Sequence, residues 1–186
     1  MRVFIALPVP DDVQDQLAEM QQDLDAGRHV EMDQMHITLA FWADLSPQDT
    51  GELADALDTI RACPLDIAFT GLDVFGGGKP RLLAAMVRLT PELDQLHRAV
   101  RSAARMAGLE LRRQRFRPHV TLARFGPRPS PDLADRLHRF LGVRAAQPLT
   151  PFVAEGMHLM QSTLGGSGPT YDLLAEYPLH PFPTND

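Results

Sequence analysis

The chain has 186 residues, a length that suits one substantial domain or two small lobes sharing a core. Hydrophobic residues make up 44% of it and charged residues 23%, which is ordinary for a soluble globular protein. No apolar run approaches the roughly 18 to 20 residues of a membrane-spanning helix, and the single cysteine, Cys63, excludes an internal disulfide. We therefore expect a cytoplasmic protein that does not cross a membrane.

The net charge of −6 is unevenly distributed. Residues 1–80 carry four cations and fifteen anions, whereas residues 81–186 carry fourteen cations and nine anions. The run LRRQRFRPH at 111–119 places four arginines before a histidine: Arg112, Arg113, Arg115 and Arg117. Guanidinium groups suit phosphate oxygens, but such a run is equally typical of a solvated surface. Because the whole chain is acidic, no general nucleic-acid footprint is indicated.

The patterns of the first half predict alternating strands and helices. In chain order these are a strand at 2–7, a helix at 11–25, a strand at 36–41, a helix opening at Ser46-Pro47, and strands within 65–75 and 81–89. The segment GGGKP between the last two strands lacks the spacing of a phosphate-binding loop, so it predicts a hairpin turn.

The second half repeats this order. It predicts a helix from Thr90-Pro91 to about Ala107, a strand at 119–125, a helix opening at Ser130-Pro131, and strands within 147–160 and 170–179 around the turn GGSGP. An offset of 83 residues superposes HITL at 36–39 on HVTL at 119–122. We interpret this as an internal duplication within one domain spanning residues 1–186. It predicts an α+β fold of two facing lobes with antiparallel strand pairing.

Each repeated motif places a histidine and a threonine on one face of a strand. Residues i and i+2 of a strand point to the same side, so His36 lies beside Thr38 and His119 beside Thr121. A single histidine in a strand is more often structural. If a pseudo-twofold axis relates the lobes, however, the four side chains converge on one cleft.

Two imidazoles facing one phosphorus atom form a general acid and a general base, because the pKa of histidine lies near neutrality. The threonine hydroxyls then donate hydrogen bonds to the non-bridging oxygens. Two histidines fall short of the three or four protein ligands typical of zinc, and no carboxylate cluster for Mg²⁺ is nearby. We expect neither a metal ion nor another cofactor.

The sequence resembles the 2H phosphoesterases, and among them the bacterial and archaeal RNA 2′,3′-cyclic phosphodiesterases also called 2′-5′ RNA ligases. The resemblance spans almost the whole chain and rests on RVFIALPVP at 2–10, MHITLAF at 35–41, RFRPHVTLARF at 115–125 and LMQSTLGGSGPTYDLLAEYPL at 159–179. It implies a bilobal fold with a central groove, and metal-free hydrolysis of a terminal 2′,3′-cyclic phosphate to a 2′-phosphomonoester.

Applied position by position, the resemblance implies that His36 is the proton donor and His119 the proton acceptor. Thr38 and Thr121 are the threonines of the two motifs. It also implies that Arg124 contacts the phosphate and that Phe41 stacks on the nucleobase. A continuous strand would point Arg124 away from His119, so its role requires a bulge or a strand end there. Phe41 reads more readily as a core residue. Tyr171 is a further candidate for substrate contact, although packing in the core or at the rim explains it equally well.

Three functions stay open at this point. The first is the cyclic phosphodiesterase, whose partners are RNA ends or nucleotides bearing a 2′,3′-cyclic phosphate. The second keeps the site but joins RNA ends through 2′-5′ linkages or opens another cyclic phosphate. The third is a non-catalytic module that binds RNA ends. We expect a monomer in each case.

Overall fold

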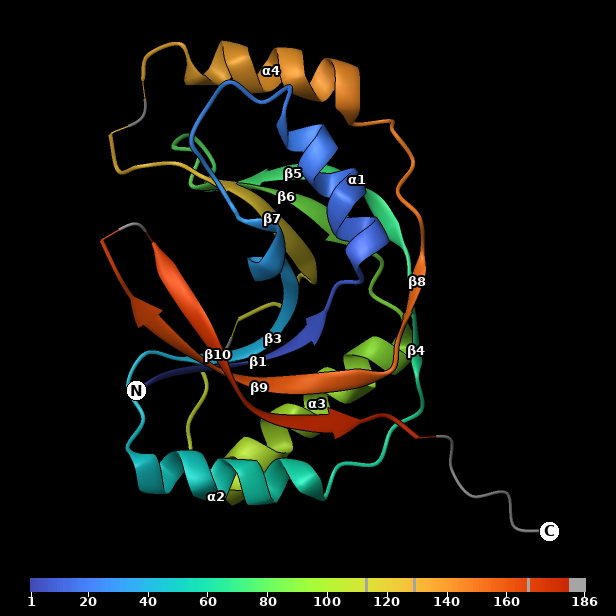
Figure 1. The fold of residues 1–186 in the computed structure, drawn as a ribbon, viewed down its shortest axis with the longest axis vertical. Helices are drawn as coiled ribbons and strands as arrows, with labels where there is room; N and C mark the ends of the chain where they lie inside the picture. The colour runs from blue at the N-terminus through green and yellow to red at the C-terminus, as the bar shows by residue number, and fades with distance from the viewer. Residues whose placement is uncertain (113, 129, 167, 181–186) are drawn as a thin grey trace, which may run out of the picture.

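The computed structural model describes residues 1–112, 114–128, 130–166 and 168–180 (Figure 1). The expectations for Arg113, for Pro129 before the fourth predicted helix, and for Ser167 in the GGSGP turn lie outside the described residues. No helix in the described ranges is long and apolar enough to span a bilayer.

One antiparallel sheet runs through the whole molecule (Figure 1). Its strands lie side by side in the order β10 (Pro169–Pro178), β9 (Gly156–Leu164), β1 (Arg2–Pro8), β3 (His36–Trp42), β7 (His119–Arg124), β6 (Leu82–Val87) and β5 (Phe69–Phe75). The short strand β2 (Arg28–His29) also pairs with β7. A separate ribbon joins β4 (Leu65–Ile67) to β8 (Phe152–Ala154). The α+β architecture predicted from the sequence is confirmed.

Two of the helices, α1 (Asp11–Gln21) and α3 (Pro91–Met106), pack on the half of the sheet that does not contain the strand before them. We call β1, β3, β9 and β10 the strands of the first lobe, and β2, β5, β6 and β7 those of the second. Helices α2 (Pro47–Asp58) and α3 cover the first lobe, whereas α1 and α4 (Leu133–Arg144) cover the second (Figure 1). Helix α1 thus follows β1 in the chain but packs on β7, and α3 follows β6 but packs on β3.

The two lobes meet at one pair of buried residues. Between β3 and β7 the only paired positions are Ile37 and Val120, within the described ranges. Both side chains are 0% exposed, so they anchor the two central strands from the core side. On either side of this pair the strands diverge, and a groove opens on the opposite face of the sheet.

Most predicted elements are confirmed, but two helix boundaries are wrong, and β9 runs to Leu164, beyond the predicted end at 160. Helix α1 ends at Gln21 rather than at 25. The Gln21 side chain is buried there and donates hydrogen bonds to the carbonyls of Val30 and Leu122. The fourth helix begins at Leu133, not at Ser130-Pro131. The Ser130 hydroxyl there donates to the Asp132 carboxylate, and Ser130 therefore does not cap the helix.

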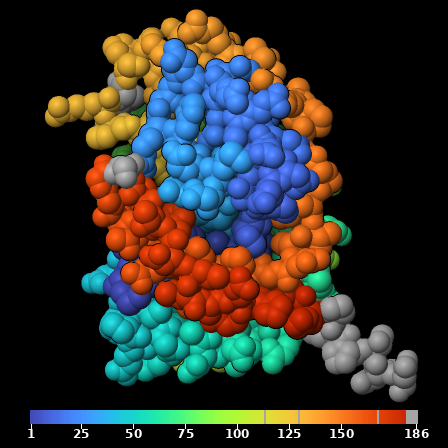
Figure 2. Space-filling model, viewed as in Figure 1, coloured from blue at the N-terminus to red at the C-terminus, as the bar shows by residue number. Residues whose placement is uncertain are grey.

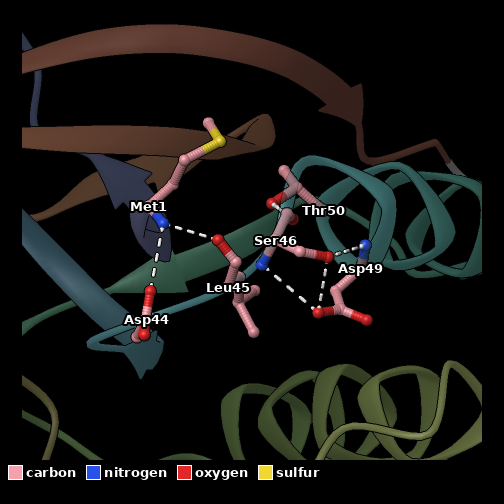
Figure 3. Close-up of polar contacts among 6 residues, drawn as sticks. All are labelled: Met1, Asp44, Leu45, Ser46, Asp49 and Thr50. Atoms are coloured by element: carbon pink, nitrogen blue, oxygen red, sulfur yellow. Dashed lines mark hydrogen bonds and ion pairs between the residues drawn. The ribbon is translucent and has the colours of Figure 1, made fainter.

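The N-terminus of α2 is stabilised by a reciprocal pair of hydrogen bonds. The Ser46 hydroxyl accepts from the Asp49 amide at 3.0 Å, and the Asp49 carboxylate accepts from the Ser46 amide at 3.2 Å. The Met1 ammonium donates to the neighbouring Leu45 carbonyl at 2.5 Å and lies 3.5 Å from Asp44 (Figure 3). The start of the chain is therefore held next to the start of this helix.

We expect Ser46→Ala to lower the free energy of unfolding by about 1 kcal/mol, the usual cost of losing a serine cap. Urea denaturation followed by circular dichroism measures the change. Gln48→Ala is the matched control, because Gln48 lies in the first turn of the same helix and makes an exposed hydrogen bond to Glu52. Equal losses in the two variants would contradict a capping role for Ser46.

Candidate active site

The two His-x-Thr pairs lie on one face of the sheet, around the Ile37–Val120 pair. Extending the antiparallel register by one residue sets His36 opposite Thr121 and His119 opposite Thr38. All four side chains are half-buried, whereas Ile37 and Val120 point into the core. His36 and Thr121 line the same pocket, so the imidazole of the first motif lies near the hydroxyl of the second.

Both imidazole rings are oriented by the same local hydrogen bond. The Nδ1 atom of His36 lies 2.7 Å from the Gln34 carbonyl, and that of His119 lies 2.7 Å from the Arg117 carbonyl. Because a carbonyl only accepts, Nδ1 carries the hydrogen in each ring. The Nε2 atom of each histidine is then the atom that gives or takes a proton.

Aromatic rings pack against each histidine. The ring of His36 stacks on Phe4 at a centroid distance of 4.7 Å and meets Tyr171 edge-on at 5.5 Å. The ring of His119 lies 4.7 Å from Phe75, and the Arg117 guanidinium lies 4.3 Å from the same Phe75 ring. Tyr171 was a sequence candidate, whereas Phe4 and Phe75 were not, because apolar residues in strands are usually core.

A β-bulge in β7 turns Arg124 toward the groove. In the pairing of β7 with β6, Ala84 lies opposite Thr121 and Leu83 opposite Ala123, so Leu122 is an extra residue. The bulge shifts the alternation by one, which puts Arg124 on the same face as His119 and Thr121. This is the irregularity that the sequence position of Arg124 requires.

The same irregularity occurs at the equivalent place in β3. Thr38 pairs with Ala6 and Ala40 with Ile5, so Leu39 is the extra residue. Phe41 consequently lies on the groove face and is 43% exposed, with the Arg2 guanidinium 5.1 Å from its ring. The interpretation of Phe41 as a core residue is therefore wrong. Trp42, by contrast, is buried.

A pocket opens on the His36 side of the groove. On one side of the pocket lies the segment that contains β2 and the 3₁₀ turn Met32–Gln34. On the other side lies the hairpin of β9 and β10. The residues that line it are Arg28, His29, Val30, Gln34, His36, Thr121, Arg124, Pro169 and Tyr171. The Gln34 side chain donates to the Pro169 carbonyl at 2.8 Å, which fixes the hairpin against that segment (Figure 2).

Comparison with known proteins identifies the family. The model of the 2′-5′ RNA ligase superfamily matches residues 9–166. The chain belongs to this superfamily, the 2H phosphoesterases.

The similar proteins described next cover 79% to 96% of this 2H phosphoesterase. The RNA 2′,3′-cyclic phosphodiesterase of Archaeoglobus fulgidus is 26% identical over 92% of this chain and 96% of its own. The protein of the same name from Aeropyrum pernix is 31% identical over 79% and 83%. The solved structure of TT0787 from Thermus thermophilus has a TM-score of 0.78 at 24% identity, and covers 96% of this chain and 98% of its own. The structure of E. coli LigT complexed with 3′-AMP has a TM-score of 0.78 at 22% identity, with coverages of 96% and 97%.

Both histidines of this 2H phosphoesterase favour the neutral form. Burial lowers the pKa of His36 to about 4, although its hydrogen bond to Gln34 raises it; the charges of Arg124 and His119 lower it further. Burial also lowers the pKa of His119, as do the charges of Arg124 and Arg117, while the hydrogen bond to the Arg117 carbonyl raises it. The charge of Arg124 thus lowers the pKa of both rings, and Arg124 lines the same pocket as His36.

No group of three or more histidine, cysteine or carboxylate side chains lies together in the part of the chain that the structure describes. The groove of this 2H phosphoesterase instead presents imidazole, hydroxyl and guanidinium groups. Groups of these kinds are chemically suited to binding an anion and to transferring protons.

We expect the ring protons of His36 to titrate with a midpoint of about 4 in the free protein. Proton NMR over a pH series measures this, and a variant with His36→Asn assigns the signal. A midpoint near the ordinary histidine value of about 6.5 would contradict the burial of the ring. Since the folded state resists protonation of His36, its contribution to stability is complete above the unfolded pKa. That contribution decreases as the pH falls from about 6.5 toward 4.

Proposed function

We propose that this chain hydrolyses the 2′,3′-cyclic phosphate at RNA ends to a 2′-phosphomonoester, with two histidines as acid and base and without a metal ion. One observation carries the proposal: two imidazoles whose Nδ1 atoms hold equivalent backbone hydrogen bonds share one face of the sheet, and the first lines a pocket together with the threonine of the second motif. The names of the curated relatives agree with this chemistry. Both motifs belong to one chain, so the proposed site is complete in a monomer.

The proposed reaction is an in-line displacement at phosphorus. The Nε2 atom of His119 takes a proton from a water molecule, whose oxygen forms a bond to phosphorus. The bond from phosphorus to O3′ breaks, and the Nε2 atom of His36 gives its proton to the departing O3′. One P–O bond is formed and one is broken, and the product keeps its phosphate on O2′.

The non-bridging oxygens gain negative charge as the water attacks. The hydroxyls of Thr38 and Thr121 donate hydrogen bonds to them, and the Arg124 guanidinium neutralises the charge. These donors are preorganised by strands whose other face is packed in the core. Phe41 and Tyr171 are the exposed or groove-facing rings on which the nucleobase would stack.

Substrate binding also explains how an acid with a low pKa becomes protonated. The phosphodiester carries a negative charge, and a nearby opposite charge raises the pKa of an imidazole. His36 therefore takes up its proton as the anion enters the groove. Binding of a phosphorylated ligand should strengthen as the pH falls toward the pKa of His36 in the free protein.

We expect purified protein in EDTA to convert adenosine 2′,3′-cyclic phosphate to adenosine 2′-phosphate, and not to the 3′ isomer. Anion-exchange chromatography separates the two products. Heat-denatured protein and buffer serve as controls for spontaneous opening. A requirement for added metal ion, or a 3′-phosphate product, would contradict the proposed mechanism.

Ligation is the second candidate, favoured by the description of the matching family model. The same acid and base would keep their roles, with the 5′-hydroxyl of a second RNA in place of water: its oxygen forms the bond to phosphorus and O3′ departs. Incubating an RNA that ends in a cyclic phosphate with a 5′-hydroxyl RNA, and measuring joined and opened products together, separates the two activities.

A further inference from the structure

A buried glutamine at the end of α1 joins this helix to β7. Helix α1 lies against β7 (Figure 1), and only 6% of the surface of its last residue, Gln21, is exposed. The side-chain amide of Gln21 donates hydrogen bonds to the Leu122 carbonyl at 2.7 Å and to the Val30 carbonyl at 2.9 Å. Glutamine is mostly an exposed residue, and when it is buried its polar atoms are paired. One amide group therefore connects α1 to two segments of the second lobe.

Leu122, which Gln21 contacts, is the extra residue of the bulge in β7. A bulge interrupts the regular ladder of backbone hydrogen bonds, and a buried carbonyl without a partner is costly. The Leu122 carbonyl accepts from the Val30 amide at 2.8 Å as well as from Gln21. Two donors thus use both lone pairs of this oxygen. The bulge is held by groups that lie outside the paired strands β6 and β7.

The bulge determines which way Arg124 points. Without an extra residue, strict alternation would turn Arg124 to the face opposite His119. With Leu122 as the extra residue, the two side chains share a face. Thr121 and Arg124 line one pocket, in agreement with this arrangement. A shift of the bulge would therefore displace a guanidinium two residues further along the chain.

The other half of the duplication has no counterpart of Gln21. The offset of 83 residues equates this position with Ala104 in α3, which is buried and has no side-chain donor. Helix α3 packs on β3, whose bulge at Leu39 turns the uncharged Phe41 outward. The glutamine thus occurs in the helix that packs on the strand whose bulge directs a charged side chain into the groove.

We propose that Gln21 is a positioning residue for Arg124: by holding the bulge at Leu122, it keeps the guanidinium on the face of the groove where the phosphate binds. This inference rests on the proposed function, in which Arg124 neutralises the charge that develops on the non-bridging oxygens. Gln21 is buried and its amide contacts backbone carbonyls. Its substitution therefore weakens catalysis only through Arg124.

A double-mutant cycle with Arg124 tests the proposal. Gln21→Met keeps the length of the side chain but has no donor. We expect it to lower kcat/KM for adenosine 2′,3′-cyclic phosphate about tenfold, a moderate misplacement of one group. In the Arg124→Gln background the same substitution should change kcat/KM little, since no guanidinium is left to position. Gln21→Leu provides the same comparison if Gln21→Met does not fold.

The titration of His36 gives a second readout that needs no turnover. Burial lowers the pKa of His36, the hydrogen bond to the Gln34 carbonyl raises it, and the charges of Arg124 and His119 lower it. If Arg124 moves away, the midpoint measured by proton NMR rises in Gln21→Met, as it does in Arg124→Gln. In the double variant it should rise no further than in Arg124→Gln alone. A general loosening of the fold around His36 would instead add to the rise.

Gln14→Met is the matched control, because Gln14 is a partly buried glutamine of the same helix and donates to the Val9 carbonyl at 2.7 Å. It should leave both readouts unchanged. Three results would overturn the proposal: no effect of Gln21→Met, effects that add to those of Arg124→Gln, or equal effects of Gln14→Met. Absence of turnover in the wild-type protein would refute the proposed function alone, because the His36 titration would still show whether Gln21 positions Arg124.

Discussion

Replacing either His36 or His119 by alanine should lower kcat for cyclic-phosphate opening by about a thousandfold, within the range attributed to general acid–base catalysis. Each variant lacks one of the two Nε2 atoms that transfer protons. Because the two imidazoles act as one unit, the double variant should be little slower than either single variant. Chromatographic measurement of the 2′-phosphate product under single-turnover conditions gives the rates.

His138→Ala is the control for these variants, because His138 is exposed on α4 and belongs to neither motif. It should retain full activity. Ligand binding distinguishes catalysis from a pure binding role. A protein that binds RNA ends without turnover, and whose affinity survives the loss of both imidazoles, would be the non-catalytic module considered from the sequence.

Removing the charge of Arg124 should have the second largest effect. We expect Arg124→Gln to reduce kcat/KM by about a hundredfold, comparable to the loss of one preorganised donor to a developing oxyanion. The charge of Arg124 lowers the pKa of both His36 and His119. Without it both values rise, so both limbs of the pH profile of kcat/KM should move to higher pH.

Arg124→Lys tests which property of the side chain matters. Lysine keeps the charge but not the planar fork, so the pH profile should stay in place while the rate falls. Arg139→Gln, on the exposed side of α4, is the matched control and should change neither. An unshifted profile in Arg124→Gln would show that its guanidinium does not act on the histidines.

The elements of the fold were largely predictable because their signals are local. Ser46-Pro47 and Thr90-Pro91 open helices as expected, and each hydroxyl accepts a backbone N–H three residues later. The crossing of α1 and α3 between the lobes was not predicted. Helical periodicity shows that a helix has a buried face, but not which sheet covers it.

The site residues were predictable where side chains alternate between the two faces of a strand, and not where a bulge interrupts this alternation. His36, Thr38, His119 and Thr121 share a face because residues i and i+2 do so in any strand. The placement of Phe41 was wrong because the bulge at Leu39 reverses the alternation. A signal was present: in both motifs two consecutive apolar residues, Leu-Ala, interrupt the alternating pattern just before the side chain that turns outward.

Arg28 had no such signal. It precedes the first motif by eight residues and enters the pocket only because β2 pairs with β7, a contact between residues far apart in the chain. A strand of two residues leaves no periodic pattern in the sequence. Long-range pairing of this kind is seen only in the folded molecule.

Helices α1 and α3 each pack on the lobe that does not contain the strand before them, and this affects how the chain can be divided. If it were cut in the loop between β5 and β6, the N-terminal fragment would keep α1, whose apolar face packs on a strand of the other fragment. The C-terminal fragment would keep α3, which packs on β3. Each piece would lack one of the two helices that cover its central strand, so the two should be soluble and ordered only when produced together.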